Sequence, residues 1–449
     1  MLLCAGYVVP VTSDPIVDGA VLVRNGRIRD IGSSEMLRLR YPDEETRDYG
    51  QAVLLPGFVD LHTHLENSVM RGMVHDVPYA QWLLAVNEIS ARMSTHDWNE
   101  SAVLGGLEAL SSGITCIADI TSTGASLRAA QKLGLRGVIY REVTAMDKSR
   151  VDAAIHLAAD DIESWSEAVD SDRLLVGIAP APLFSCHPLV LKRVAKYAGD
   201  DLPVAMHLAG SREESNFIQY GSSTFSVHNM QGKRGYVEVP PWLPTGTSPV
   251  QYALNWDAFK PAHVLAIHCV HVDEDDINTL KQNNVSIAVC PRCNAQLGMG
   301  VAPMSEFLDQ GFAVGIGSDS PAATNSTDML IEMRNAMLVQ RAINVKFLSS
   351  QAVLEAATIG GARAIHLDDQ IGSLEIGKMA DIIAIDISSS HQMPTTDHVS
   401  AVVGTTSGSD VVMSMVGGTI RYEQNRWHVD VEVAKNIATI IGIRGKLRR

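Results

Sequence analysis

The chain has 449 residues, with 51 acidic against 36 basic side chains and a formal charge of −15. This balance argues against binding to nucleic acid through phosphate contacts, because such a surface must be locally basic. Hydrophobic residues make up 46% and charged residues 19%, which excludes a disordered chain and indicates a large aliphatic core. We expect no membrane span and no signal peptide, because no apolar run approaches the roughly 20 residues that cross a bilayer. Six cysteines are too few for a disulfide framework, so we expect a cytoplasmic protein.

The first 56 residues predict short strands joined by turns. Alternating Val, Leu and Ile surround an Asn25-Gly26 pair. Asn-Gly between two β-prone runs is the strongest short signal for a hairpin. We therefore expect a hairpin centred on this pair.

From Gly57 to about Leu367, short apolar runs alternate with helical patterns. Continuous aliphatic runs are typical of parallel strands that are buried on both faces, and eight of them with intervening helices predict a (β/α)₈ TIM barrel. Helices are expected, for example, over 327–342 and 350–357. The eight predicted strands lie in 53–62, 113–120, 135–143, 173–180, 202–208, 263–269, 285–290 and 312–319.

Strand-and-turn character returns after the barrel. A β-rich start and a β-rich end that flank a barrel suggest one small domain built from both termini. We predict an α/β fold in which residues 57–367 form the barrel and residues 1–56 and 368–449 form a composite β-sandwich domain. The Gly-, Ser- and Pro-rich stretch 221–249 is predicted to be a loop on the catalytic face, with a plain surface insertion as the alternative.

Five polar residues stand at the ends of predicted strands. His62 and His64 follow the first strand, His207 ends the fifth, His268 the sixth and Asp319 the eighth. The carboxyl ends of barrel strands meet at one face, so these side chains should converge. Several imidazoles and a carboxylate around a divalent ion, with one position left for water, form a catalytic metal site. The alternative for each histidine taken alone is a hydrogen-bonded pocket residue.

Several ordered motifs also resemble a known family. PGFVDLHTHLENSVMRG, HLAGSREESNFIQYGSSTF, HCVHVDEDDI, CPRCNAQLGMG and GIGSDSPAATNSTDM together resemble the amidohydrolase superfamily, and within it the cytosine deaminase-like branch. That branch includes methylthioadenosine/adenosylhomocysteine, aminodeoxyfutalosine and chlorotriazine enzymes. The resemblance implies one divalent ion, with zinc expected first and iron as the alternative, bound by His62, His64, His207 and Asp319. It also implies that His268 hydrogen-bonds the attacking water or the developing oxyanion. No lysine ends the fourth predicted strand, where two-metal relatives carry a bridging lysine, so one ion is expected.

The expected chemistry is hydrolytic. A divalent ion lowers the pKa of bound water towards about 7, which yields a nucleophile at neutral pH. We expect Asp319 to take the proton as water attacks an electrophilic ring carbon, and His268 to stabilise the charge that develops. An amine would then leave as ammonia.

One position departs from the branch pattern. Its deaminases carry His-x-x-Glu on the fifth strand, where the glutamate protonates a ring nitrogen, but this chain has His207 followed three residues later by Gly210. Loss of a positioned general acid typically lowers a rate by about 10²–10⁴-fold. Glu213 and Glu214 are the nearest carboxylates. Their pattern after Ser211 favours instead a capping box at the start of a helix.

The substrate-side residues are less distinctive. Related nucleoside deaminases have a Pro-His-Ala-Pro-Tyr pattern after the fourth strand, whereas this chain reads Pro-Ala-Pro-Leu-Phe over 180–184. The resemblance suggests substrate contacts for Trp82, for Cys293 and for its neighbour Asn294. Arg141 would meet an anionic substrate group. Trp82 in a helix core and Arg141 in a structural ion pair are the alternatives.

We therefore predict a hydrolase that acts on a carbon–nitrogen bond of a small molecule. The first hypothesis is a deaminase of an aminated N-heterocycle, of the purine-like nucleoside type. The alternatives are another C–N or C–halide hydrolysis of the triazine or pterin type, and a metal-retaining inactive paralogue. We expect neither nucleic acid nor membrane as a partner, and a homo-oligomer by analogy with related enzymes.

Overall fold

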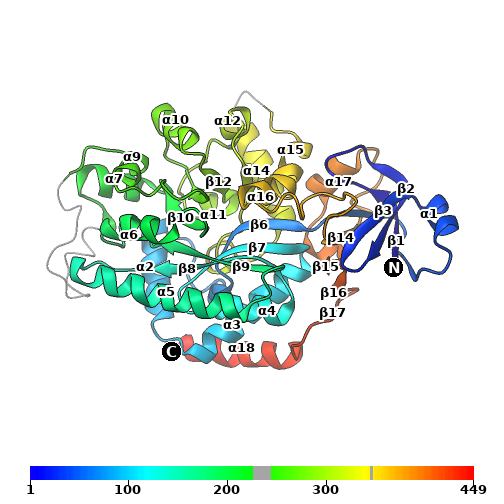
Figure 1. Cartoon of the computed structure of the whole chain (residues 1–449), viewed down its shortest axis with the longest axis horizontal. Coiled ribbons are helices and arrows are strands. Elements are labelled where there is room, and N and C mark those ends of the chain that lie inside the picture. Colours follow the sequence, from blue (N-terminus) through cyan, green and yellow to red (C-terminus); the bar gives the residue numbers. More distant parts are fainter. Residues whose placement is uncertain (226–243, 344–346, 449) are drawn as a thin grey trace.

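The computed structural model describes residues 1–225, 244–343 and 347–448. It consists of an eight-stranded sheet and a nine-stranded sheet, which lie side by side (Figure 1). The part of the predicted loop 221–249 that spans 226–243 lies outside the described residues. Within the described part of the chain, no helix is long and apolar enough to cross a membrane.

The eight-stranded sheet is the predicted barrel. Its strands pair in parallel, each with its neighbour in the sequence. The last strand meets the first through a bridge between Thr63 and Asp319, where Asp319 N donates to His62 O at 2.7 Å. This confirms the TIM-barrel prediction. The strands are β6 (Phe58–Thr63), β7 (Ile114–Thr121), β8 (Arg136–Val143), β9 (Leu174–Pro180), β10 (Val204–Leu208), β11 (Val264–His268), β12 (Ser286–Val289) and β13 (Val314–Ile316).

Helices follow the barrel strands, and the two example helices predicted from the sequence are confirmed as α14 and α15. Before β7 come the 3₁₀ helix η1 (Leu65–Met70), α2 (Tyr79–Ser90) and α3 (Thr95–Ser111). The later ones are α4 (Ala125–Leu133), η2 (Lys148–Arg150), α5 (Val151–Ala168), α6 (Leu189–Ala198), α7 (Arg212–Tyr220), α9 (Pro249–Asn255), α10 (Glu274–Gln282), α11 (Pro291–Gln296), α12 (Met304–Asp309), α13 (Pro321–Thr324), α14 (Met329–Ile343), α15 (Ser350–Ala356) and α16 (Ile359–Ala364).

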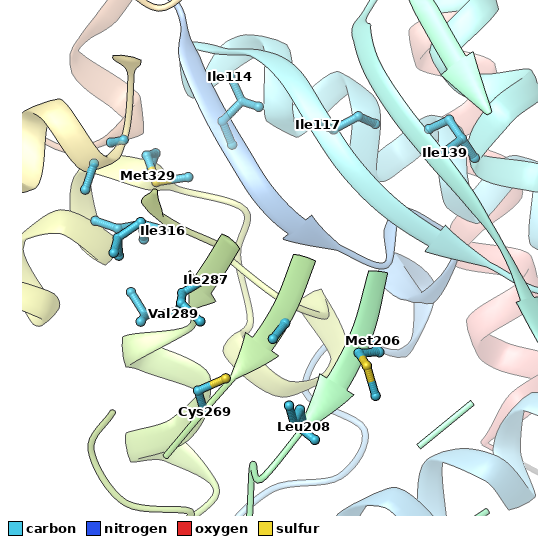
Figure 2. Packing of buried hydrophobic residues seen from close by; sticks show 14 of the residues in the cluster. Ile114, Ile117, Ile139, Met206, Leu208, Cys269, Ile287, Val289, Ile316 and Met329 are labelled. Carbon is cyan, nitrogen blue, oxygen red and sulfur yellow. The ribbon is translucent and has the colours of Figure 1, made fainter. Parts of the chain in front are cut away.

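The barrel strands bury both faces, as their continuous aliphatic runs predicted. One large cluster packs on the strands from the helix side, and Figure 2 shows part of it, including Ile117 of β7 and Ile139 of β8. The alternate residues Ala118 and Tyr140 belong to a second cluster on the opposite face. Because side chains alternate along a strand, the even-numbered residues of β7 from Cys116 onward share this inner face with Val138 and Tyr140 of β8.

The nine-stranded sheet joins both ends of the chain, and in Figure 1 its blue N-terminal strands lie beside the orange and red strands. β5 pairs antiparallel with β14 at its centre, and β1 pairs in parallel with β4 and β5. The division into residues 57–367 and a composite of 1–56 and 368–449 remains a prediction. The strands are β1 (Leu2–Val8), β2 (Ile16–Arg24), β3 (Arg27–Ser33), β4 (Thr46–Asp48), β5 (Ala52–Pro56), β14 (Ile382–Asp386), β15 (Val411–Val416), β16 (Thr419–Glu423) and β17 (Arg426–Trp427). Its short helices are α1 (Ser34–Arg40), α17 (His398–Thr405) and η3 (Gly408–Asp410).

The predicted hairpin is confirmed. Arg24 pairs with Arg27, and the two residues between them, Asn25 and Gly26, have φ angles of 52° and 74°. Both angles are positive, as a type I′ turn requires, and Asn and Gly tolerate this region best.

The prediction of one strand over 53–62 is wrong. The structure divides this run at Gly57 into β5 of the terminal sheet and β6 of the barrel. A Cβ atom at Gly57 would lie 2.1 Å from Thr115 Oγ1, so only glycine fits where the chain crosses between the sheets. An aliphatic run cannot reveal such a division, because both halves are equally buried.

A C-terminal helix was not predicted. α18 (Val433–Leu447) lies along α3, where Figure 1 shows it in red, although this end was expected to be strands and turns. Asn436 Nδ2 donates to Glu100 O, and Ile440 and Leu447 are buried. The spacing of 436, 440, 443 and 447 is the helical signal that the sequence analysis missed.

A buried ion pair connects the barrel to the terminal sheet. Arg136, at the start of β8, donates from Nε to Asp381 Oδ2 at 2.7 Å, and both residues are at most 4% exposed. Asp381 Oδ1 also accepts from Gly417 N at 2.7 Å. Removing one member of a buried pair leaves the other charge without compensation, and this is costly.

We expect Asp381→Ala to lower the free energy of unfolding by about 3–5 kcal/mol, because the Arg136 guanidinium stays buried without its partner. Urea denaturation followed by circular dichroism measures this loss. Replacing both residues by Met and Leu should recover part of it. Asp152→Ala, which removes an exposed ion pair with Arg193, is the control and should leave the midpoint unchanged. An Asp381→Ala variant as stable as the parent would contradict this role.

Candidate active site

The five polar strand-end residues converge, as the barrel prediction required. His62 Nε2 lies 3.2 Å from His207 Nε2 and 3.6 Å from Asp319 Oδ1. The ring centroids of His62 and His64 are 4.7 Å apart, and His268 Nε2 lies 3.8 Å from Asp319 Oδ2. Four imidazoles and one carboxylate therefore share one small volume at the carboxyl ends of the strands.

The backbone is strained where two of these residues leave their strands. His268 has φ 76° and Asp319 has φ 61°, a region that non-glycine residues adopt at a cost. Hydrogen bonds from neighbouring strands hold the conformation: Cys269 N donates to Leu208 O, and Asp319 N donates to His62 O. Strain of this kind persists only where the surrounding structure enforces it, and it concentrates at functional sites.

The cluster fits a divalent cation. Nitrogen ligands about 2.0–2.1 Å from a tetrahedral zinc lie about 3.3 Å apart, close to the 3.2 Å between the His62 and His207 Nε2 atoms. His64 Nδ1 donates to Ile120 O at 3.0 Å, which leaves its Nε2 free as a ligand. The buried Nδ1 atoms of His62 and His207 have no hydrogen-bond partner among the described residues. Among the described residues there are two overlapping sets of possible ligands, one of His62, His64 and His207 and one of His62, His268 and Asp319.

Burial and charge set suitable protonation states for a cation site. Burial lowers the pKa of His62, His64 and His207. Burial acts to raise the pKa of Asp319, but the neighbouring histidines outweigh it and hold that pKa well below its usual value. The imidazoles are therefore neutral and the carboxylate is ionised at neutral pH, as metal ligands must be.

Asn294 determines which nitrogen of His268 faces the cavity. His268 Nδ1 lies 3.0 Å from Asn294 Oδ1, and an amide oxygen only accepts, so Nδ1 carries the proton. Burial lowers the pKa of His268 to about 4. The neutral ring therefore presents an unprotonated Nε2, which can accept a proton and afterwards donate it.

Two buried aspartates hold the strand ends by hydrogen bonds, and neither was predicted from the sequence. Asp60 accepts from Ser318 N and Ser318 Oγ, and Asp119 Oδ2 accepts from Thr63 Oγ1 and Leu65 N. Burial raises the pKa of Asp60 to about 8 and that of Asp119 to about 7. Asp60 stands two residues before His62, and this spacing was the available signal.

A cavity of about 380 Å³ opens beside the histidine cluster, which is within the usual size range for small-molecule sites. His64, His207, His268 and Asp319 line one part of its wall. Aromatic side chains line another part, including Tyr79, Trp82, Phe184 and Phe225.

The predicted substrate residues fall into two groups. Trp82 and Cys293 line the cavity, and Trp82 Nε1 donates to Ala322 O at 3.2 Å. Asn294 is not among the lining residues, and its contact with His268 favours a positioning role. Arg141 is also absent from the lining, because its Nε donates to Asp161 at 2.7 Å, which favours the structural alternative.

At position 210, glycine leaves little room for a side chain. A Cβ atom there would lie 3.1 Å from both His268 Cδ2 and the terminal methyl of Met299. Ser211 Oγ accepts from Glu214 N, as expected of a helix cap. The Glu214 carboxylate, however, accepts from Ala209 N and Gly210 N, so it holds the end of β10 and does not close a capping box. Glu214 is buried and does not line the cavity.

Known proteins are similar to this chain in sequence over most of its length. A 5-methylthioadenosine/S-adenosylhomocysteine deaminase of Desulforudis audaxviator is 30% identical over 424 residues, which cover 94% of this chain and 93% of that protein. The enzyme of the same name from Moorella thermoacetica is 30% identical over 425 residues, which cover 92% of each chain.

Solved structures agree at the level of the fold. An adenosine deaminase from Xanthomonas campestris with bound zinc has a TM-score of 0.85 at 24% identity and covers 100% of this chain and 98% of its own. Atrazine chlorohydrolase from Arthrobacter aurescens, complexed with zinc, has a TM-score of 0.83 at 21% identity over 99% of both chains. A bacterial imidazolonepropionase-like composite domain model matches residues 19–43. The amidohydrolase family model matches residues 53–421, and the chain belongs to this family.

Proposed function

We propose that the protein is a metal-dependent hydrolytic deaminase of an aminated N-heterocycle of the purine nucleoside type. One divalent ion, with zinc as the first candidate, would be held by His62, His64, His207 and Asp319. The observation that carries the proposal is the convergence of these side chains at one end of a small-molecule cavity. Relatives named as methylthioadenosine/adenosylhomocysteine deaminases support the substrate type. The cytoplasmic location and the homo-oligomeric state expected from the sequence remain predictions.

The residues around the cluster suit proton transfer during hydrolysis. When bound, a divalent ion lowers the pKa of water towards about 7 and so supplies a nucleophile at neutral pH. Asp319 and His268 line the cavity beside the other candidate ligands, and each would offer a proton acceptor to the attacking water. Once protonated, His268 donates from Nε2 to the oxyanion that develops, while Asn294 holds the ring in place. Aromatic walls on the other side of the cavity exclude water and stack on a heterocycle.

The second candidate is another hydrolysis on a related ring, such as displacement of a halide or an alkylamine. The observation that favours it is the absence of an acid at position 210, where Met299 and His268 occupy the adjoining space. A ring that is already electrophilic needs less protonation of its ring nitrogen, and it therefore tolerates the loss of this acid better than a purine does.

A substrate panel tests the proposed reaction. We expect ammonia release from at least one of adenosine, methylthioadenosine, adenosylhomocysteine, aminodeoxyfutalosine or a pterin, measured with a coupled assay on protein of known metal content. A chlorotriazine that releases chloride, together with no ammonia from any amine, would establish the second candidate. No turnover of any compound by the metal-loaded protein would favour an inactive paralogue.

Metal content tests the proposed ligands. We expect about one divalent ion per chain by mass spectrometry, and its loss when both His62 and His64 are replaced by alanine, because two of the neutral ligands disappear. The exposed His391→Ala is the matched control and should retain the ion. Two ions per chain would contradict the single-ion arrangement.

Substitutions at position 210 test whether the missing acid limits the rate of deamination. Gly210→Glu combined with Met299→Ala, which provides room for the new side chain, should raise deamination by about 10²-fold if only the acid is absent. Gly210→Ala with Met299→Ala is the control, because it adds bulk without a carboxyl group. Equal rates for the two double variants would show that protonation at this position does not limit the reaction.

A further inference from the structure

Glu142 is a carboxylate of the cavity wall that the proposed mechanism does not use. It lies near the end of β8, on the inner face that Tyr140 also occupies, and it lines the same cavity as His207 and Asp319. On the neighbouring strand β9, the register partner of Glu142 is the small inner residue Ala179, and Ala181 just beyond that strand lines the cavity. The neighbouring strand therefore leaves space beside the Glu142 side chain.

Glu142 differs from the other glutamate of the cavity in its partners. Glu66 accepts from Thr121 Oγ1 at 2.6 Å and from Thr123 Oγ1 at 2.5 Å, and it also accepts from Ser122. No described residue hydrogen-bonds the Glu142 carboxylate, and burial together with the charge of Glu66 raises its pKa to about 7. The Glu66 carboxylate thus accepts its hydrogen bonds from the protein, whereas the Glu142 carboxylate can still accept hydrogen bonds from a ligand.

No cation of the described cavity wall compensates Glu142. None of the described lining residues is a lysine or an arginine. The adjacent Arg141 donates to Asp161 and to the backbone oxygen of Glu142, so its charge acts to lower the pKa of Glu142 but its hydrogen bonds do not reach the carboxylate. An anionic group in this cavity would meet Glu142 and Glu66, and repulsion by like charges would weaken its binding.

An aromatic cluster lines the same cavity as Glu142. Phe184, which follows β9, stacks on Phe225 with ring centroids 3.9 Å apart, and Tyr79 meets both rings edge to face. A carboxylate and aromatic faces in one cavity both attract an organic ammonium group, through charge-assisted hydrogen bonds and cation–π contacts.

We propose that Glu142 binds a protonated amine of the substrate, outside the ring that reacts. This inference rests on the proposed function, because it names the class of substrate that the same cavity accepts. It makes Glu142 a specificity residue, with no part in the bond that breaks. The preferred substrates are aminated heterocycles whose tail is cationic, followed by those with a neutral tail, while an anionic tail is rejected.

Three adenosines that differ in the charge of the 5′ substituent test this preference. They are 5′-amino-5′-deoxyadenosine, methylthioadenosine and adenosine-5′-carboxylate. We expect the cationic compound to bind the zinc-loaded protein about tenfold more tightly than the neutral one, and the anion to bind most weakly, as measured by calorimetry. Equal affinities, or a preference for the anion, would overturn the proposal without any variant.

Glu142→Gln then assigns the preference to one side chain, since it removes the charge and keeps the shape. The KM of the cationic compound should rise about tenfold while its kcat stays the same, and the values for methylthioadenosine should change little. Glu167→Gln, an exposed charge change on α5, is the matched control. An equal loss for all three compounds would indicate a structural role, and a fall in kcat alone would indicate an acid, so either result would overturn the proposal.

The two proposals fail in different ways. If no compound is deaminated but calorimetry shows the cation bound most tightly and Glu142→Gln abolishes the difference, the deaminase proposal fails and the assignment of Glu142 stands. If deamination occurs with no dependence on tail charge, the proposed function stands and the assignment of Glu142 fails.

Discussion

Closure of the parallel barrel is the constraint on which the site depends. The hydrogen bond from Asp319 N to His62 O joins the segment after β13 to β6, and it places the Asp319 carboxylate beside His62. The strand ends then turn through positive φ angles at His268 and Asp319, so that side chains from four strands face one point. A rigid scaffold of this kind can hold several neutral imidazoles close together. On a flexible loop, the same side chains would move apart.

Polar residues around the cluster supply hydrogen bonds that hold its buried side chains in place. Asp60 and Asp119 accept backbone and hydroxyl protons from segments that carry the candidate ligands, and Asn294 orients His268. Such outer contacts commonly set the orientation and basicity of metal ligands. Glu142 differs from Glu66 in this respect, because it is half-buried and no described residue hydrogen-bonds its carboxylate, whereas Glu66 is buried and accepts from Thr121.

The sequence departs from the deaminases that its motifs resemble on the substrate side, whereas the proposed metal ligands keep that pattern. Gly210 stands where those deaminases carry a glutamate, and the Pro-Ala-Pro-Leu-Phe segment over 180–184 stands where they carry Pro-His-Ala-Pro-Tyr. Phe184 lines the cavity, and a side chain at position 210 would meet His268. Under the proposed function, these differences therefore change substrate choice and proton supply, while the proposed ligands stay the same.

The sequence by itself determined the barrel, the hairpin at Asn25-Gly26 and the convergence of the histidines with Asp319, because strand periodicity and strand-end position are local signals. It did not reveal the break at Gly57, the helix over Val433–Leu447 or the different environments of Arg141 and Glu142. Arg141 and Glu142 are neighbours in the chain, and alternation along β8 sends one to Asp161 and the other into the cavity. Only the tertiary structure decides which of these two side chains faces the cavity, because residues distant in sequence supply the burial and the charges around each of them.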